Sequence, residues 1–233
     1  MSERKIKLQI KDMTKKYDNG DGVEHINLDI YEGEIVTFLG PSGCGKTTIL
    51  RTIGGFLDVT SGDITVDGQS IISLPPEKRP TAMVFQSYNL WPHMTIYENL
   101  AFGLKLRKVP KAEIDADVKK YLQLVSMPGC EKKYPGQLSG GQQQRIAIAR
   151  SLMLKPSLLL LDEPFVGLDP KASVILKEIM RNICDEGGAI FFSTHVLDVA
   201  EKLCDKVAII KDGVLVASGD MEQIVKPGQS LES

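Results

Sequence analysis

The chain has 233 residues, a formal net charge of −2, and 25% charged and 42% hydrophobic residues, the composition of an ordinary globular protein. Its near-neutral charge excludes a general attraction to nucleic acid or acidic lipid, and no apolar run approaches the roughly 18 residues of a membrane-spanning helix. The N-terminus has no signal-peptide core and the four cysteines form no CxxC pair, so we expect reduced thiols in a cytosolic protein.

The first third of the chain reads mainly as strands. Residues 6–10 and 26–30 alternate apolar and polar side chains, which predicts half-exposed strands of an antiparallel sheet. The continuous apolar run 35–39 predicts a strand buried on both faces, and the glycine-rich loop after it leads into a predicted helix from Thr47 to Leu57. Further strands are expected around 64–66 and 82–85.

The middle of the chain has helical spacing, and strands then return. Helices are predicted over residues 96–106, 111–125 and 141–154, and strands over 158–161, 189–193 and 207–210, with Pro170 opening a helix between two of these strands. Alternating strands and helices favour a parallel sheet. We therefore expect one domain spanning 1–233, with an α/β core of about 1–87 and 156–233 and an inserted helical subdomain of about 88–155.

A phosphate-binding loop is predicted at residues 40–47, whose spacing is G-x-x-x-x-G-K-[ST]. Its backbone amides surround phosphate oxygens, Lys46 neutralises the β- and γ-phosphates, and the Thr47 hydroxyl reaches Mg²⁺. The alternative, a glycine-rich turn in an unrelated protein, is disfavoured because a buried strand precedes the loop and a helix follows it. The predicted nucleotide-binding residues here are Gly40, Ser42, Gly43, Cys44, Gly45, Lys46, Thr47 and Thr48.

Two carboxylates follow the apolar strand 158–161. Asp162 is expected to hold Mg²⁺ through water, and Glu163 to act as general base toward the attacking water. The alternative, a strand that ends in solvated acids, is disfavoured because a phosphate loop is already present and needs a metal ligand.

One cysteine, Cys44, lies inside the phosphate loop, beside a predicted helix N-terminus and Lys46. Both features favour a reactive thiol. We expect alkylation of Cys44 to block ATP binding.

Residues 138–142 read Leu-Ser-Gly-Gly-Gln, and with the motifs above the chain resembles the ATP-binding cassette family, the nucleotide-binding subunits of ABC transporters. Further matches in the family's order are Tyr17, Gln86, Asp169 in Gly167-Leu168-Asp169, and His195. The resemblance covers nearly the whole chain. It implies a P-loop NTPase (RecA-like) α/β core, an antiparallel N-terminal β subdomain and an inserted α-helical subdomain, with ATP and Mg²⁺ as cofactors.

The resemblance also implies a role for each motif. Ser139, Gly140, Gly141 and Gln142 would close on the ATP held by a second copy, giving a head-to-tail homodimer around two ATPs with Asp169 at its seam. Gln86 would sense Mg²⁺ and the attacking water and communicate with a membrane permease. His195 would bind the γ-phosphate and position Glu163, and Tyr17 would stack on adenine, although an aromatic at that place also fits a bracing role in a turn.

The two halves of the chain resemble different branches of the family. Residues 83–103 are similar to importer subunits for sugars, polyamines or iron. Such subunits often carry an additional C-terminal β domain, and we expect this chain to be too short to contain one. Residues 185–200 and 228–233 are similar to exporter-type (ABC-2-like) ATPases. A chimera joined near 155–165 and ordinary divergence both explain this, and we favour the chimera.

The expected function is that of an ATPase subunit, cytoplasmic and peripheral at the inner face of the membrane, that powers a separate permease touching residues 86–102. An importer permease is the better guess. An isolated or engineered chimera without a permease is the alternative. A soluble ABC ATPase of DNA repair or translation is less favoured, because there is one cassette, no long coiled coil and no basic face, and no nucleic-acid partner is expected.

Overall fold

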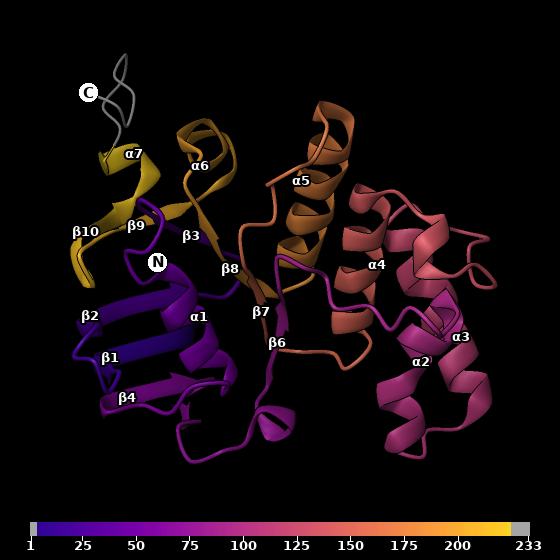
Figure 1. Cartoon of the computed structure of the whole chain (residues 1–233), viewed down its shortest axis with the longest axis horizontal. Coiled ribbons are helices and arrows are strands. Elements are labelled where there is room, and N and C mark those ends of the chain that lie inside the picture. The colour runs from indigo at the N-terminus through magenta and orange to yellow at the C-terminus, as the bar shows by residue number, and fades with distance from the viewer. Residues whose placement is uncertain (1–3, 225–233) are drawn as a thin grey trace.

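The computed structural model describes residues 4–224 and contains two β-sheets with the first helix between them, plus a group of helices at one end (Figure 1). Helix α1 (Lys46–Gly54) contacts strands of both sheets. Its buried side chains Ile49, Leu50 and Ile53 belong to the same apolar cluster as residues of both sheets. The helix that follows the phosphate loop is thus fixed on two sides.

The smaller sheet is antiparallel, with strand order β2-β1-β4-β5. Its members are β1 (Ile6–Lys16), β2 (Gly22–Tyr31), β4 (Ser61–Val66) and β5 (Gln69–Ser70). Alternate residues such as Leu8, Ile10, Ile26 and Ile30 are buried toward α1, which confirms the period-two prediction. The turn after β1 carries Tyr17.

The larger sheet has six strands in the order β10-β9-β3-β8-β7-β6. Its strands are β3 (Ile35–Leu39), β6 (Thr81–Val84), β7 (Leu158–Leu161), β8 (Ala189–Thr194), β9 (Lys206–Lys211) and β10 (Val214–Asp220). All pairs are parallel except β9 with the edge strand β10, which the sequence reading did not predict. The carboxyl ends of β3, β8, β7 and β6 therefore lie in a row along one edge of the sheet.

Helices cover the large sheet and extend beyond it. Between β6 and β7 lie α2 (Ile96–Leu106), α3 (Lys111–Leu124) and α4 (Gly140–Leu152), which contact one another and sit together at one end of the molecule (Figure 1). The remaining helices are α5 (Pro170–Asp185), α6 (Leu197–Leu203) and α7 (Met221–Ile224), with 3₁₀ turns at Pro76–Lys78 and Pro135–Gln137. Within residues 4–224, no helix has the length and apolarity needed to cross a bilayer.

A buried arginine anchors the far end of α1. Arg79 is 8% exposed and donates hydrogen bonds to the carbonyl oxygens of Thr52 (2.7 Å) and Ile53 (2.9 Å) in the last turn of α1. It also donates to the carbonyl oxygens of Leu74 (2.8 Å) and Ile72 (3.3 Å). The last carbonyls of a helix have no partner within it, so Arg79 supplies donors that water cannot.

Replacing Arg79 with methionine should destabilise the fold. The Thr52 carbonyl oxygen keeps the Gly55 amide (3.2 Å), but the carbonyl oxygens of Ile53 and Leu74 lose the donors that Arg79 supplies, which we expect to cost about 3 kcal/mol of unfolding free energy. Urea denaturation followed by circular dichroism measures the effect. The control is Arg107→Met on an exposed side chain, which should change the midpoint little, and equal midpoints for the two variants would contradict this role of Arg79.

Candidate functional site

The phosphate loop joins the buried strand β3 to α1. Gly43 (φ 83°) and Gly45 (φ 108°) adopt left-handed backbone conformations that glycine reaches without strain. Gly45 is the N-cap residue of α1, and no side chain caps this helix start. Its first backbone amides are therefore available to an anion, which the positive end of the helix also attracts.

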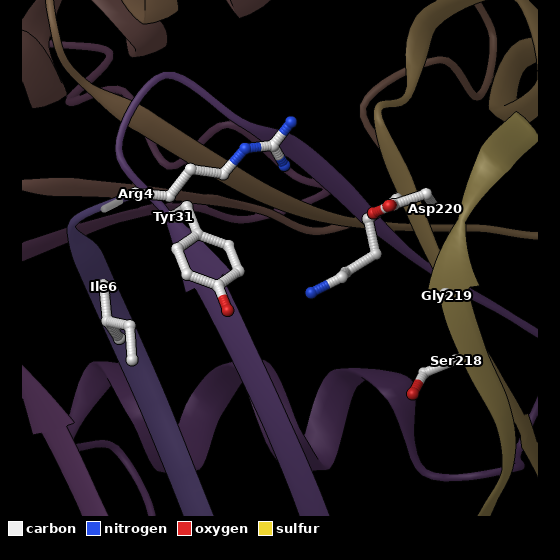
Figure 2. A pocket seen from close by; sticks show the side chains of 7 residues that line it. Arg4, Ile6, Tyr31, Ser218, Gly219 and Asp220 are labelled. Carbon is white, nitrogen blue, oxygen red and sulfur yellow. The ribbon is translucent and has the colours of Figure 1, made fainter. Parts of the chain in front are cut away.

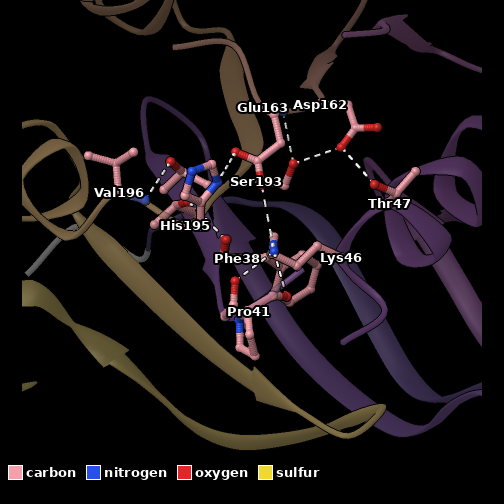
Figure 3. A network of polar contacts seen from close by, with 12 residues as sticks. Phe38, Pro41, Lys46, Thr47, Asp162, Glu163, Ser193, His195 and Val196 are labelled. Atoms are coloured by element: carbon pink, nitrogen blue, oxygen red, sulfur yellow. Dashed lines mark hydrogen bonds and ion pairs between the residues drawn. The ribbon is translucent and has the colours of Figure 1, made fainter. Parts of the chain in front are cut away.

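Lys46 is folded against its own loop. Its Nζ donates to the carbonyl oxygens of Gly40 (2.6 Å) and Pro41 (3.0 Å) and lies 3.6 Å from Oε1 of Glu163 (Figure 3). The side chain is 6% exposed, so its charge is directed into the site.

Asp162 connects three segments that are distant in sequence. Its Oδ1 accepts hydrogen bonds from the Thr47 hydroxyl (2.9 Å) and the Ser193 hydroxyl (2.8 Å) (Figure 3). The Ser193 hydroxyl in turn accepts from the backbone amide of Glu163 (3.0 Å). Ser193 was not among the residues predicted from the sequence, and the only signal in the sequence was its place two residues before His195.

Glu163 and His195 form a pair over the loop. Oε2 of Glu163 lies 3.0 Å from Nδ1 of His195, while Oε1 faces Lys46. Glu163 has φ 48°, a left-handed conformation that is uncommon for a non-glycine residue and is typical of functional sites. The Glu163 side chain is 15% exposed and that of His195 51%, so the pair stands at the mouth of the site.

Three adjoining cavities surround this network. The first, of about 310 Å³, is lined by Ser42, Gly43, Gly45, Lys46, Thr47, Thr48, Gln86, Glu163, Val166 and His195. The second, of about 490 Å³, also includes Gln86, with Thr47 and Asp162. The third, of about 420 Å³, includes Tyr17, whose hydroxyl lies 3.2 Å from that of Thr48. Together they form a cleft at the carboxyl ends of the parallel strands, where α/β sheets bind ligands.

A larger hollow, of about 860 Å³, lies elsewhere, between the edges of β2 and β10 (Figure 2). The Lys206 amine donates to the Asp29 carbonyl oxygen (2.8 Å) and lies 5.2 Å from the centre of the Tyr31 ring, and Arg4 pairs with Glu34 (3.1 Å). These groups hold the two sheets together. None of the sequence-predicted site residues lines this hollow.

The Leu-Ser-Gly-Gly-Gln segment does not join the site. Ser139 begins α4 with a reciprocal cap: its hydroxyl accepts from the Gln142 amide (3.3 Å), and its amide donates to Oε1 of Gln142 (2.9 Å). Ser139 and Gly140 are exposed, and none of the residues 139–142 lines the three cavities of the cleft. Asp169 is likewise exposed and caps α5, accepting from the Ala172 amide (2.8 Å).

The oxygens of Thr47 and Asp162 fit a hard divalent cation that shares its coordination with phosphate. They lie 2.9 Å apart and face the second cavity. Across residues 4–224, no cluster of three or more His, Cys, Asp or Glu side chains offers a metal site made by protein alone. Mg²⁺ typically takes one or two protein oxygens and completes its octahedron with phosphate and water.

All four cysteines are unpaired and buried. Cys44 is 5% exposed and belongs to the apolar cluster beneath α1, so the thiol that the sequence predicts to be reactive is shielded from solvent. Its alkylation requires local opening of the loop.

Thiol labelling of the native chain should therefore be slow and insensitive to alkaline pH. Burial raises the pKa of Cys130 and Cys204, and raises that of Cys184 to about 12. A raised pKa keeps the thiol protonated, so the rise in thiolate that an ordinary cysteine shows between pH 7 and 9 should not occur at these three. Titration with a chromogenic disulfide should show four fast thiols in denaturant and slow reaction in buffer at both pH values; fast native labelling at pH 9 would contradict it.

A phosphate loop after a buried central strand, with Asp162 and Glu163 at the end of a parallel strand in the same sheet, defines an α/β P-loop NTPase. Two solved structures share the fold, each with a TM-score of 0.86. One is cbiO1 from Clostridium perfringens, described as part of the ABC transporter complex cbiONQ, at 30% identity over 94% of this chain and 90% of that one. The other is an ATP-binding subunit of an ABC transporter, at 29% identity over 97% and 96%.

The sequence profile of the ABC transporter family matches residues 23–166. The chain belongs to this family and contains its ATP-binding domain, so the predicted fold class and ATP binding are confirmed. It is similar to the spermidine/putrescine import ATP-binding protein PotA of Thermotoga maritima, at 46% identity over 213 residues, which are 91% of this chain and 58% of the relative. PotA of Vibrio vulnificus is 41% identical over 228 residues, 96% of this chain and 60% of the relative. The chain spans about three fifths of the length of these relatives.

The comparisons give the chimera hypothesis no support. The Vibrio vulnificus relative aligns over 96% of the chain, which includes the supposed join at 155–165. An alignment that continues across this segment is compatible with ordinary divergence. The exporter-like segment 228–233 lies outside the described residues.

Proposed function

We propose that the chain binds Mg-ATP, dimerises head to tail around two ATPs, and hydrolyses them to drive transport through a separate membrane permease. The observation that carries this proposal is the Glu163 carboxylate, held between Lys46 and His195 above the phosphate loop. A carboxylate in that place can take a proton from water attacking the terminal phosphate.

The binding step uses the phosphate loop. Lys46 leaves the carbonyl oxygens of Gly40 and Pro41 and moves its charge to the β- and γ-phosphates, while the amides at the start of α1 bind phosphate oxygens. Thr47 and Asp162 would hold Mg²⁺, which would supply positive charge to the phosphates. Tyr17 is 40% exposed beside Thr48 and offers its ring to the adenine.

The hydrolytic step depends on placing groups rather than on covalent chemistry. Glu163 accepts the proton of the attacking water, and His195 fixes the carboxylate and hydrogen-bonds the γ-phosphate. Gln86 lines the first and second cavities, where it would sense Mg²⁺ and the attacking water. Ser193 supports this geometry by holding the Glu163 amide and the Asp162 carboxylate at once.

A second copy completes the site. Ser139 to Gln142 and Asp169 are outside the cleft of their own chain, and the start of α4 is a positive helix end suited to phosphate. In a head-to-tail dimer, the signature segment of each chain meets the ATP of the other, with Asp169 at the seam.

The membrane partner would contact residues 86–102. These residues include the beginning of the helical subdomain, which spans about 88–155. This region follows Gln86 directly, so it is placed to transmit the state of the site. Because the PotA relatives are named import proteins, an importer permease is favoured, with the chain peripheral at the inner face of the membrane.

The concentration dependence of hydrolysis tests the proposal. Purified chain with Mg-ATP should release phosphate, and its specific activity should rise with protein concentration because only the dimer is active. EDTA should abolish the release. Hydrolysis whose specific activity is constant down to nanomolar protein would contradict the shared site, and no hydrolysis at any concentration would contradict the enzyme.

A further inference from the structure

The turn that follows Gln86 has an unusual backbone. Tyr88 (φ 59°) and Asn89 (φ 50°) are consecutive non-glycine residues in the left-handed region. The Tyr88 amide donates to the Phe85 carbonyl oxygen (2.9 Å), and the Ser87 hydroxyl donates to Oδ1 of Asn89 (2.7 Å). Such a conformation costs energy and persists only when surrounding contacts hold it.

Arg150, in the last full turn of α4, supplies those contacts. Its Nη1 donates to the Asn89 carbonyl oxygen (2.7 Å) and its Nη2 to the Tyr88 carbonyl oxygen (3.2 Å). The guanidinium also lies 4.9 Å from the centre of the Trp91 ring, which packs on Phe102 of α2 at 4.6 Å. The planar fork of arginine suits this combination of two bonds and one stacking contact, which lysine cannot reproduce.

The same turn also reaches the first turn of α4. A methyl group added to Gly140 would lie 4.0 Å from the Tyr88 hydroxyl, so this side chain lies beside the signature segment. Tyr88 is partly buried and packs on the main apolar cluster. The turn after Gln86 is therefore hydrogen-bonded to α4 at Arg150 through two carbonyl oxygens, and its Tyr88 side chain lies beside Gly140 at the other end of the helix.

We propose that Tyr88 and Arg150 are positioning residues that tie the loop bearing Gln86 to the signature helix of the same subunit. The inference rests on the proposed function. Gln86 lines the cavities at the chain's own phosphate site, whereas Ser139 meets the ATP of the second copy. When nucleotide displaces Gln86, the turn passes the movement to α4. The ATP bound by one subunit thereby controls how the signature segment of that subunit meets the ATP of the second copy.

The test separates nucleotide affinity from dimer formation. In a Glu163→Gln background, Arg150→Met should bind a fluorescent ATP analogue within about twofold of the parent, because Arg150 touches no residue of the phosphate loop. Its Mg-ATP dimer, measured by sedimentation velocity, should need roughly tenfold more protein, since two hydrogen bonds that fix α4 to the turn are lost. Tyr88→Leu, which keeps apolar packing, should shift dimerisation in the same direction.

Arg145→Met is the matched control. Arg145 lies on the same helix and also donates to carbonyl oxygens, those of Val125 (3.1 Å) and Ser126 (3.2 Å), but it does not contact the turn after Gln86. Its dimerisation should stay near that of the parent. Arg150→Lys keeps the charge and should recover part of the lost dimerisation. It also takes the place of Arg150→Met in the test if the methionine variant does not fold.

The possible outcomes are distinct. The inference would be overturned if Arg150→Met and Arg150→Lys dimerise at the same protein concentration as the parent. An equal loss of dimerisation in Arg145→Met would also overturn it, because any loosening of α4 would then be enough to weaken the dimer. A parallel loss of analogue binding would also overturn it. If the Glu163→Gln parent itself does not dimerise with Mg-ATP, the proposed function fails rather than this inference alone.

Discussion

Glu163→Gln should retain Mg-ATP, lose hydrolysis and accumulate a nucleotide-bound dimer. The amide keeps the size of the carboxylate and can still contact His195, but it cannot accept the proton of the attacking water. Loss of a general base slows a reaction by roughly 10²–10⁴-fold. It also removes a negative charge 3.6 Å from the Lys46 amine, beside the place where phosphate enters, so ATP binding should not weaken.

Two measurements on one sample check this expectation: phosphate release, and sizing chromatography with saturating Mg-ATP. Glu178→Gln, on an exposed position of α5, is the control and should hydrolyse ATP like the parent. A Glu163→Gln chain that stays monomeric under these conditions would show that the isolated chain does not form the shared site. Retained hydrolysis would remove Glu163 from the role of base.

Lys46→Ala should have the opposite effect on assembly, because it should strongly weaken nucleotide binding. The ammonium group is the only side-chain cation among the residues that line the 310 Å³ cavity, apart from His195 when protonated. Its loss should weaken ATP affinity by about 3 kcal/mol, roughly a hundredfold, as expected for strong hydrogen bonds to a charged group. At an ATP concentration that saturates only the parent, the variant's site is mostly empty and the signature segment of a second copy has no nucleotide to contact, so no dimer should form.

Isothermal titration calorimetry with ATP and Mg²⁺ measures this change. Lys119→Ala, on the exposed face of α3, removes a lysine away from the cleft and should bind like the parent. An affinity of Lys46→Ala within a few fold of the parent would contradict the assignment of the phosphate site. Together the two variants separate binding from hydrolysis, since Glu163→Gln should dimerise and Lys46→Ala should not.

Local pattern was sufficient for most elements of the fold. Period-two alternation identified β1 and β2, and the continuous apolar runs identified β3 and β7, because these patterns reflect which faces of a strand are buried. The predicted helix to Leu57 ends earlier, at Gly54, because Gly55 takes a left-handed conformation and caps it. The edge strand β10 was missed, since its largely exposed residues alternate too weakly to be distinguished from a loop.

Short motifs were enough to pick out the phosphate loop, the carboxylate proposed to bind metal and the signature segment, because the spacing of residues within each motif reflects local chemistry. How these motifs meet depends on contacts between segments that are distant in the chain. The strand order β3-β8-β7-β6 brings Thr47, Ser193 and Asp162 into one hydrogen-bonded network. It leaves Ser139 outside the cleft and joins Arg150 to the turn after Gln86. Strand order and these contacts arise from packing between segments far apart in the chain, which no local pattern encodes.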